Sequence, residues 1–128
     1  MPMDRQQLET WAVAYIDAYR TVSQSVKDEL WWAIEKSMML VTRECPPEDI
    51  WEFILEVLKR SPPPKVIEVL AAGPLEDLLG YAGDQYIDAI EVEARNNPAF
   101  RDLLGGVWQN RMSQEVWARV ELVRGARW

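Results

Sequence analysis

LAAGPLEDLL, at residues 70–79, and FRDLLGGVW, at residues 100–108, are the stretches that decide the fold of this chain. Each stretch combines leucines at helical spacing with a Gly-Pro or a Gly-Gly pair. Glycine is favoured just after the end of a helix, and proline is favoured at the first position of the next one. Gly83-Asp84 and Asn96-Asn97-Pro98 repeat this punctuation. The pattern predicts short helices joined by tight turns.

Apolar residues recur three and four positions apart in the rest of the chain, and we find no alternating segment long enough for a strand. We therefore predict an all-α protein of about eight short helices. Their arrangement is expected to be either a HEAT-like helical stack or an irregular orthogonal bundle. The expected helices lie at about 4–22, 25–41, 46–58, 65–72, 74–79, 84–95, 98–104 and 113–123.

Helix termini can also be assigned. Asp4 and Ser113 are expected to cap their helices, and either Ser23 or Ser25 is expected to open the second helix. The predicted inner face of that second helix is formed by Val26, Leu30, Ala33, Ile34, Met38 and Val41. Trp31 and Trp32 point about 100° apart on the same helix. At least one of the two must therefore meet another helix, a partner or water.

The length of 128 residues corresponds to about one domain. Ser61-Pro62-Pro63-Pro64 is the strongest break, because three prolines cannot continue a helix. Too few helices lie on either side of it for each part to fold alone. We therefore expect a single domain, 1–128, with a proline-rich hinge at 61–64.

Several classes of enzyme are excluded by composition. The chain has no histidine, which removes the commonest general base and metal ligand. Its one cysteine, Cys45, can form no internal disulfide and no Cys-His pair, and we expect it to be a small apolar residue near a helix end. We therefore predict no catalytic residues, no metal site and no cofactor. No signal-like or membrane-spanning segment is visible, so the expected location is the cytoplasm.

The net charge of −7 is concentrated in the middle of the chain. Residues 46–97 hold 11 acids and 4 bases, whereas residues 98–128 hold 3 acids and 5 bases. An acidic centre argues against nucleic-acid binding, which needs Lys and Arg at the phosphates. It permits a basic protein partner, although a solvated surface that keeps the protein soluble is the simpler interpretation.

The acidic residues fall into three groups, which we take as candidate partner-binding residues. The groups are Glu48, Glu52 and Glu56 on one helix face, Asp84, Asp88 and Glu91 on another, and Glu76 with Asp77 in a first helical turn. Like charges at this spacing repel one another by a few tenths of a kcal/mol per pair. That cost is small on a solvated face, and it is also typical of a surface that a basic partner covers. For Glu76 and Asp77, compensation of the helix dipole is the alternative.

The C-terminus is basic and aromatic. Trp117 and Trp128 lie among Arg111, Arg119, Arg124 and Arg127, and with Trp31 they complete the candidate partner-binding set. The alternative is a tail that folds against the acidic middle or contacts a second subunit. Gly105-Gly106 is expected to end a helix and to let Val107 and Trp108 pack on the core, so Phe100 and Trp108 are both predicted to be buried.

Part of the chain resembles a domain found in uncharacterised bacterial proteins of similar size. The resemblance rests on LAAGPLEDLL at 70–79, a G-D-x-[YF]-I segment at 83–87, NPAFRDLLGGVWQN at 97–110 and MSQEVWARV at 112–120. It implies a soluble, all-helical bacterial protein, and it implies no particular activity.

Size, charge and the missing catalytic set favour a protein-binding role. The leading hypothesis is an acidic inhibitor or immunity-type protein that neutralises a basic toxin or effector, with no nucleic-acid or membrane partner. A small-molecule-binding protein or a carboxylate-dependent enzyme is the first alternative, in which one carboxylate buried in a pocket would have a raised pKa. The second alternative is an inhibitor that mimics nucleic acid.

Overall fold

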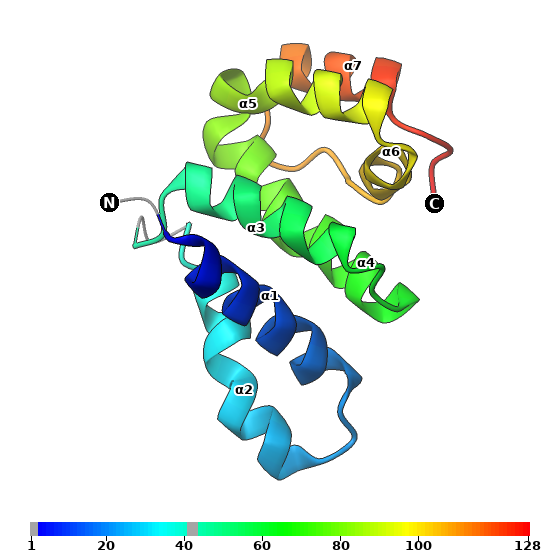
Figure 1. The fold of residues 1–128 in the computed structure, drawn as a ribbon. Coiled ribbons are helices and arrows are strands. Elements are labelled where there is room, and N and C mark those ends of the chain that lie inside the picture. Colours follow the sequence, from blue (N-terminus) through cyan, green and yellow to red (C-terminus); the bar gives the residue numbers. More distant parts are fainter. Residues whose placement is uncertain (1–2, 41–43) are drawn as a thin grey trace. The chain divides into compact units, whose positions relative to one another are not determined.

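The computed structural model describes residues 3–40 and 44–128, and all regular secondary structure in them is helical. In order, the elements are α1 Arg5–Arg20, α2 Gln24–Ser37, α3 Pro47–Lys59, α4 Pro64–Leu70, a π-helical segment η1 Ala71–Leu75, α5 Glu76–Asn96, α6 Pro98–Leu104 and α7 Gln114–Val123 (Figure 1). No strand occurs within those two ranges. The predicted all-α class is confirmed.

The chain forms two compact units, Met1–Ile67 and Glu68–Trp128, and the division falls within α4. It lies shortly after the proline run at 61–64. The single-domain organisation, the hinge and the HEAT-like arrangement remain predictions.

The caps predicted at Asp4, at Ser113 and at one of Ser23 and Ser25 are confirmed, whereas the helix start expected at Asp84 lies inside α5. The Asp4 carboxylate accepts the Gln7 backbone N–H at 2.8 Å, and the Gln7 side chain accepts the Asp4 N–H at 3.1 Å, so two unpaired donors of the first turn are satisfied reciprocally. Ser23, rather than Ser25, caps α2. Asn97 caps α6 and Ser113 caps α7 through their side-chain oxygens.

The helix count is lower than predicted, because two expected helix ends are only distortions. α4, η1 and α5 follow one another without a loop, which leaves six separate helical stretches in the described part of the chain rather than about eight. Pro74 has no N–H, and it is accommodated in a π turn where the Glu76 N–H reaches back five residues to the Ala71 carbonyl. The second distortion is a kink at Ala82 (φ −141°, ψ 26°), one residue before the predicted stop at Gly83.

In the first unit, α1 packs against both α2 and α3 (Figure 1). Trp11 of α1 is fully buried. Its ring stacks on Phe53 of α3 with 3.9 Å between ring centres, and its indole N–H donates to the Ala33 carbonyl of α2 at 2.9 Å. One side chain thus joins three helices and satisfies its own polar group.

The predicted inner face of α2 was partly wrong. Ala33 and Ile34 are buried, but Val26 and Met38 are 39% and 51% exposed. The helix ends at Ser37, whose hydroxyl donates to the Ile34 carbonyl, and Met38 is already its C-cap residue. Val41 lies outside the described residues.

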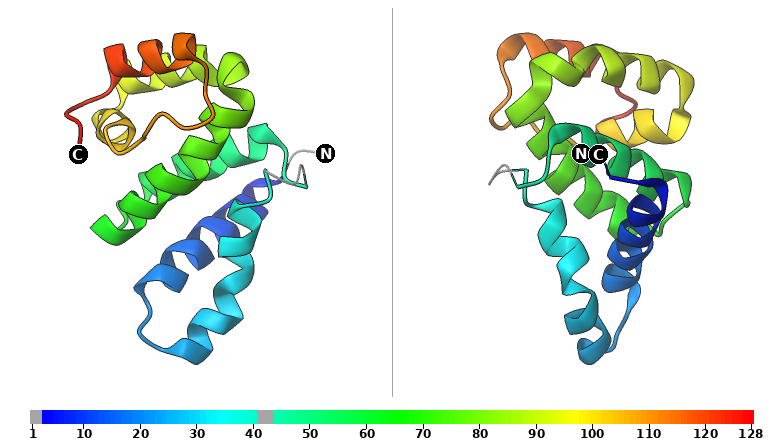
Figure 2. Two further views of the ribbon diagram at one scale, coloured as in Figure 1. Left: turned by 180° about the vertical axis from the view of Figure 1, so that it is seen from behind. Right: turned by 60° about the vertical axis from the view of Figure 1, so that its left-hand side comes forward.

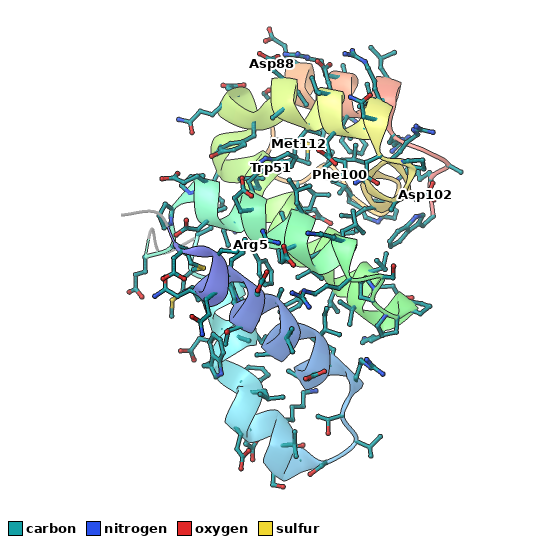
Figure 3. All side chains as sticks on the ribbon, viewed as in Figure 1. Arg5, Trp51, Asp88, Phe100, Asp102 and Met112 are labelled. Carbon is teal, nitrogen blue, oxygen red and sulfur yellow. The ribbon has the colours of Figure 1, made fainter. Side chains whose placement is uncertain are left out.

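In the second unit, α5 packs against α6 and α7. Phe100 is fully buried, as predicted (Figure 3). The same prediction was wrong for Trp108, which is 59% exposed. After the Gly105-Gly106 turn, the neighbouring Val107 takes the inward position and Trp108 turns outward.

Candidate partner-binding surfaces

Glu48 and Glu52 are the part of the α3 acidic group that remains open to solvent. They border a hollow of about 340 Å³ that is also lined by Met3, Arg5, Leu8 and Asp49. Asp49 is largely buried and accepts the Met3 backbone N–H at 3.5 Å. The lining combines the apolar side chains of Met3 and Leu8 with three carboxylates and one guanidinium, so a long basic side chain would meet both apolar surface and net negative charge there.

Glu56 does not belong to that surface, which corrects the sequence-based grouping. Only 4% of its side chain is exposed. Its two carboxylate oxygens bind Arg5 at 2.7 Å and Arg60 at 3.0 Å. A helical stripe is determined by spacing alone, whereas burial depends on the helix packed beside it, here α1.

The α5 group is divided in a similar way. The Arg119 guanidinium of α7 binds Glu91 at 2.5 and 2.9 Å and Asp88 at 2.5 Å. These hydrogen bonds hold the pKa of Glu91 below its usual range. Asp88 remains 87% exposed (Figure 3), and Asp84 carries no ion pair to any described residue. Two of the three carboxylates therefore join α5 to α7.

Glu76 and Asp77 are half-buried at the start of α5. Burial raises the pKa of both carboxyl groups. For Glu76, the hydrogen bond from the Trp108 backbone N–H at 3.4 Å opposes this rise in pKa. For Asp77, the nearby positive charge of Arg111 opposes it. Because they are half-buried where η1 meets α5, these two carboxylates fit an intramolecular contact better than a partner-binding site.

The kink at Ala82 faces a pocket of about 320 Å³. A Cβ atom on Gly80 would lie 3.1 Å from the Arg111 side chain, and one on Gly83 would lie 3.2 Å from Val116, so these glycines allow the 111–116 segment to approach α5 closely. Arg111 donates to the Tyr81 hydroxyl and lies over its ring, 5.2 Å from the ring centre. Asp84, Gln85 and Ser113 complete the polar lining.

The C-terminal aromatic residues are held within their own unit. The final segment returns from α7 to α6, as both views of Figure 2 show. It donates to three carbonyls at the end of α6: Gly125 N–H to Arg101, Trp128 indole N–H to Asp102, and Trp128 N–H to Gly105, at 2.9, 3.0 and 3.1 Å. Carbonyls in the last turn of a helix lack the usual partner four residues further on, although the Asp102 carbonyl also accepts the Gly105 N–H at 3.0 Å. Trp128 thus folds back onto the end of α6, which lies outside the acidic residues 46–97 that the sequence suggested as its contact.

The other two C-terminal tryptophans contact arginines. The Arg124 guanidinium lies 5.3 Å from the ring centre of Trp117, and Arg127 lies 4.3 Å from that of Trp108. Trp117 is half-buried. Trp128 and Trp108 remain 53% and 59% exposed.

Trp31 is the candidate tryptophan that is most open in the first unit, at 46% exposed, and its neighbour Trp32 is 43% exposed. The sequence reasoning selected Trp31 and missed Trp32. The sequence contained a hint of this exposure, because two adjacent residues on a helix point about 100° apart and cannot both face its one packed side.

Comparison with known proteins places the chain in a family. Residues 20–127 match a family described as a family of unknown function, DUF6869. The chain belongs to this family. The match covers nearly all of the second unit and the first unit from residue 20 on, and it extends well beyond the 70–120 region of the resemblance noted from the sequence. The comparisons with curated proteins and with solved structures found no match.

Within residues 3–40 and 44–128, no three Cys, Asp or Glu side chains are grouped so that they could hold a metal ion. In the same residues, no helix is long and apolar enough to cross a membrane.

Proposed function

We propose that this chain is an acidic protein-binding module that neutralises a basic protein partner, such as a toxin or effector, in the bacterial cytoplasm. The observation that carries the proposal is the exposure of large aromatic side chains. Trp31, Trp32, Tyr81, Trp108 and Trp128 are each 43–59% exposed. Tryptophan and tyrosine are enriched among the residues that dominate binding energy at protein interfaces.

The distribution of engaged charges supports a basic partner. Most cationic side chains of the described residues already have an intramolecular contact. Arg5, Arg60, Arg119 and Arg124 bind carboxylates, and Lys27, Lys36, Arg111 and Arg127 lie over aromatic rings. Glu48, Glu52 and Asp84 are exposed and have no cation within ion-pair distance in the described structure. The unneutralised surface charge is therefore mainly negative, as the net charge of −7 requires.

The test is capture with the full chain, followed by association kinetics of the captured partner at about 0.02 M and about 0.3 M salt. Glu48→Gln/Glu52→Gln removes two negative charges at the hollow. Gln6→Lys/Thr10→Lys changes the net charge equally at exposed positions of α1 and serves as the control. We expect the first pair to slow association at low salt more than the control does.

Two outcomes would refute the proposal. The first is that capture at low salt recovers no basic protein. The second is that association of the captured protein depends neither on salt nor on the Glu48 and Glu52 charges. Electrostatic steering acts mainly on association, so its absence would be visible there.

Binding of a small molecule is the second candidate function, and the pocket at the Ala82 kink favours it. Its volume of about 320 Å³ is at the lower end of the range of ligand sites. A thermal-shift screen of small carboxylates would test it, with Arg111→Gln as the matched variant. If no compound raises the melting temperature of either the wild type or Arg111→Gln, this candidate function is excluded.

A further inference from the structure

The outward face of α2 differs from the other helix surfaces of the first unit because two stripes of exposed residues run along it. The first stripe is Asp28, Trp31, Glu35 and Met38, and the second is Ser25, Glu29 and Trp32. Members of a stripe are three or four residues apart and are neighbours on a helix. A pair of half-exposed tryptophans is thus bracketed by carboxylates about one turn to either side.

The exposed charges of this face are negative: Lys36 follows Trp32 by four residues and continues the second stripe, but its ammonium group, like that of Lys27, is turned toward α1. Lys27 Nζ lies 5.8 Å from the centre of the Tyr19 ring, and Lys36 Nζ lies 4.8 Å from the centre of the Trp11 ring. Asp28 accepts a hydrogen bond from Gln24 at 2.8 Å, which leaves its charge uncompensated. None of the three acidic residues of this face, Asp28, Glu29 and Glu35, forms an ion pair with a residue that the structure describes.

The packing of α2 leaves this face open. The helix packs chiefly on α1 and buries only Ala33, Ile34 and Ser37. Apolar side chains that stay exposed on a helix without a partner on that side are typical of an interaction surface. The caps at both ends of α2 are formed within the chain, so the helix exists before any partner binds.

We propose that the outward face of α2 is the docking surface for a basic amphipathic helix of another protein. This inference rests on the proposed function and adds a second surface of the first unit to the hollow at Glu48 and Glu52. Complementarity decides the chemistry: Trp31, Trp32 and Met38 receive apolar side chains, while Asp28, Glu29 and Glu35 receive Lys or Arg. A helical segment fits because its side chains repeat with the same pitch as the two stripes on α2. Arginine or lysine near the indole rings adds a cation–π contact.

The probe is a labelled peptide of about 18 residues, built of Leu and Lys with Leu at i, i+3, i+4 and i+7. Two peptides serve as controls: one with the same composition and the helical spacing destroyed, and one with Glu in place of Lys. Binding to the full chain is followed by fluorescence anisotropy. We expect the spaced Leu/Lys peptide to bind and both controls to bind at least about tenfold more weakly.

Two protein variants locate the site. Trp31→Ala/Trp32→Ala is expected to weaken binding of the spaced peptide by at least about tenfold. Asp28→Asn/Glu29→Gln/Glu35→Gln is expected to slow its association at low salt, and to do so much less at high salt. Val92→Ala/Leu122→Ala is the control, because it also truncates two exposed apolar side chains but lies in the other unit. Circular dichroism of each variant verifies that it is folded.

Three results would overturn the inference. The first is that the spaced peptide does not bind, and the second is that it binds Trp31→Ala/Trp32→Ala with unchanged affinity. The third is that the chain self-associates through this face and becomes monomeric in that variant. In the last case the occupant is a second copy rather than a basic helix. A basic partner that is captured by the full chain but insensitive to the α2 variants would leave the proposed function standing and refute only this surface.

Discussion

Gly106 provides the sharpest test of how the C-terminal segment is held. An added Cβ atom at Gly106 would overlap the six-membered ring of Trp128. No described glycine has a positive φ, so the requirement at this position is space and not backbone conformation. Gly106→Ala should therefore displace Trp128 from α6. Gly73→Ala is the matched control, because nothing lies within 4 Å of a Cβ atom there.

The magnitude follows from what the displaced side chain loses. Trp128 is 53% exposed, so docking removes roughly 100 Å² of a large aromatic side chain from water, which corresponds to about 2.5 kcal/mol. Its two hydrogen bonds, to Asp102 and Gly105, add about 0.5–1.5 kcal/mol each. Side-chain and backbone ordering opposes both gains. We expect Gly106→Ala to lower the free energy of unfolding by about 2–3 kcal/mol, and Gly73→Ala, inside a helical stretch, to change it by about 1 kcal/mol or less.

Urea unfolding of both variants, alone and combined with Trp128→Ala, is the assay. Once the indole is absent, the added methyl group meets no ring, so Gly106→Ala should cost much less in the Trp128→Ala background. Equal costs of Gly106→Ala in both backgrounds would refute the reasoning, because the clash would then lie elsewhere.

Three further predictions concern buried or paired groups. In urea titrations, Glu56→Gln should lower the stability of the first unit by about 1–3 kcal/mol, because Glu56 is buried and held in ion pairs. The exposed Glu52 is the control, and Glu52→Gln should cost less than about 0.5 kcal/mol. Equal costs of the two substitutions would contradict the structure. Glu91 has a lowered pKa through Arg119, so its contribution to stability is present above its unfolded pKa and is lost as the pH falls through the folded pKa. Wild type should therefore be more stable than Glu91→Gln at pH 7 and should converge with it as the pH falls through the folded pKa of Glu91, and a pH-independent gap would exclude this pairing. Burial raises the pKa of Cys45 to about 11, so its alkylation at about pH 8 should require unfolding, and rapid labelling of the native protein would place the thiol at the surface.

The sequence predicts the helical class and the helix caps because these depend on local chemistry. Asp4, Asn97 and Ser113 cap their helices through atoms only two or three residues away. Gly73-Pro74 was misinterpreted as a helix end because the same dipeptide also fits a π turn within a longer helical stretch. Which of the two forms depends on the packing of both flanking segments, and a local pattern does not contain that information.

The candidate site is less predictable for the same reason. Glu52 and Glu56 are equivalent on the helix surface, and only the neighbouring α1 with Arg5 makes one of them buried. Trp108 was assigned to the core because of the glycines before it, but those glycines make room for the C-terminal segment. The exposure of Trp32 could have been inferred, since α2 is too polar elsewhere to be packed on all sides.

Site-specific crosslinking from α2 tests the central claim most directly. A photoreactive phenylalanine analogue at position 32 of the full chain is irradiated in the source cell, and the crosslinked peptide is identified by mass spectrometry. The same group at position 92, which is also exposed but lies on α5, is the control. Our account predicts an adduct from position 32 only, on a Lys- or Arg-rich segment of another protein with apolar residues at helical spacing. An adduct on an acidic segment, on a second copy of this chain or equally from both positions, or no adduct at all, would contradict it.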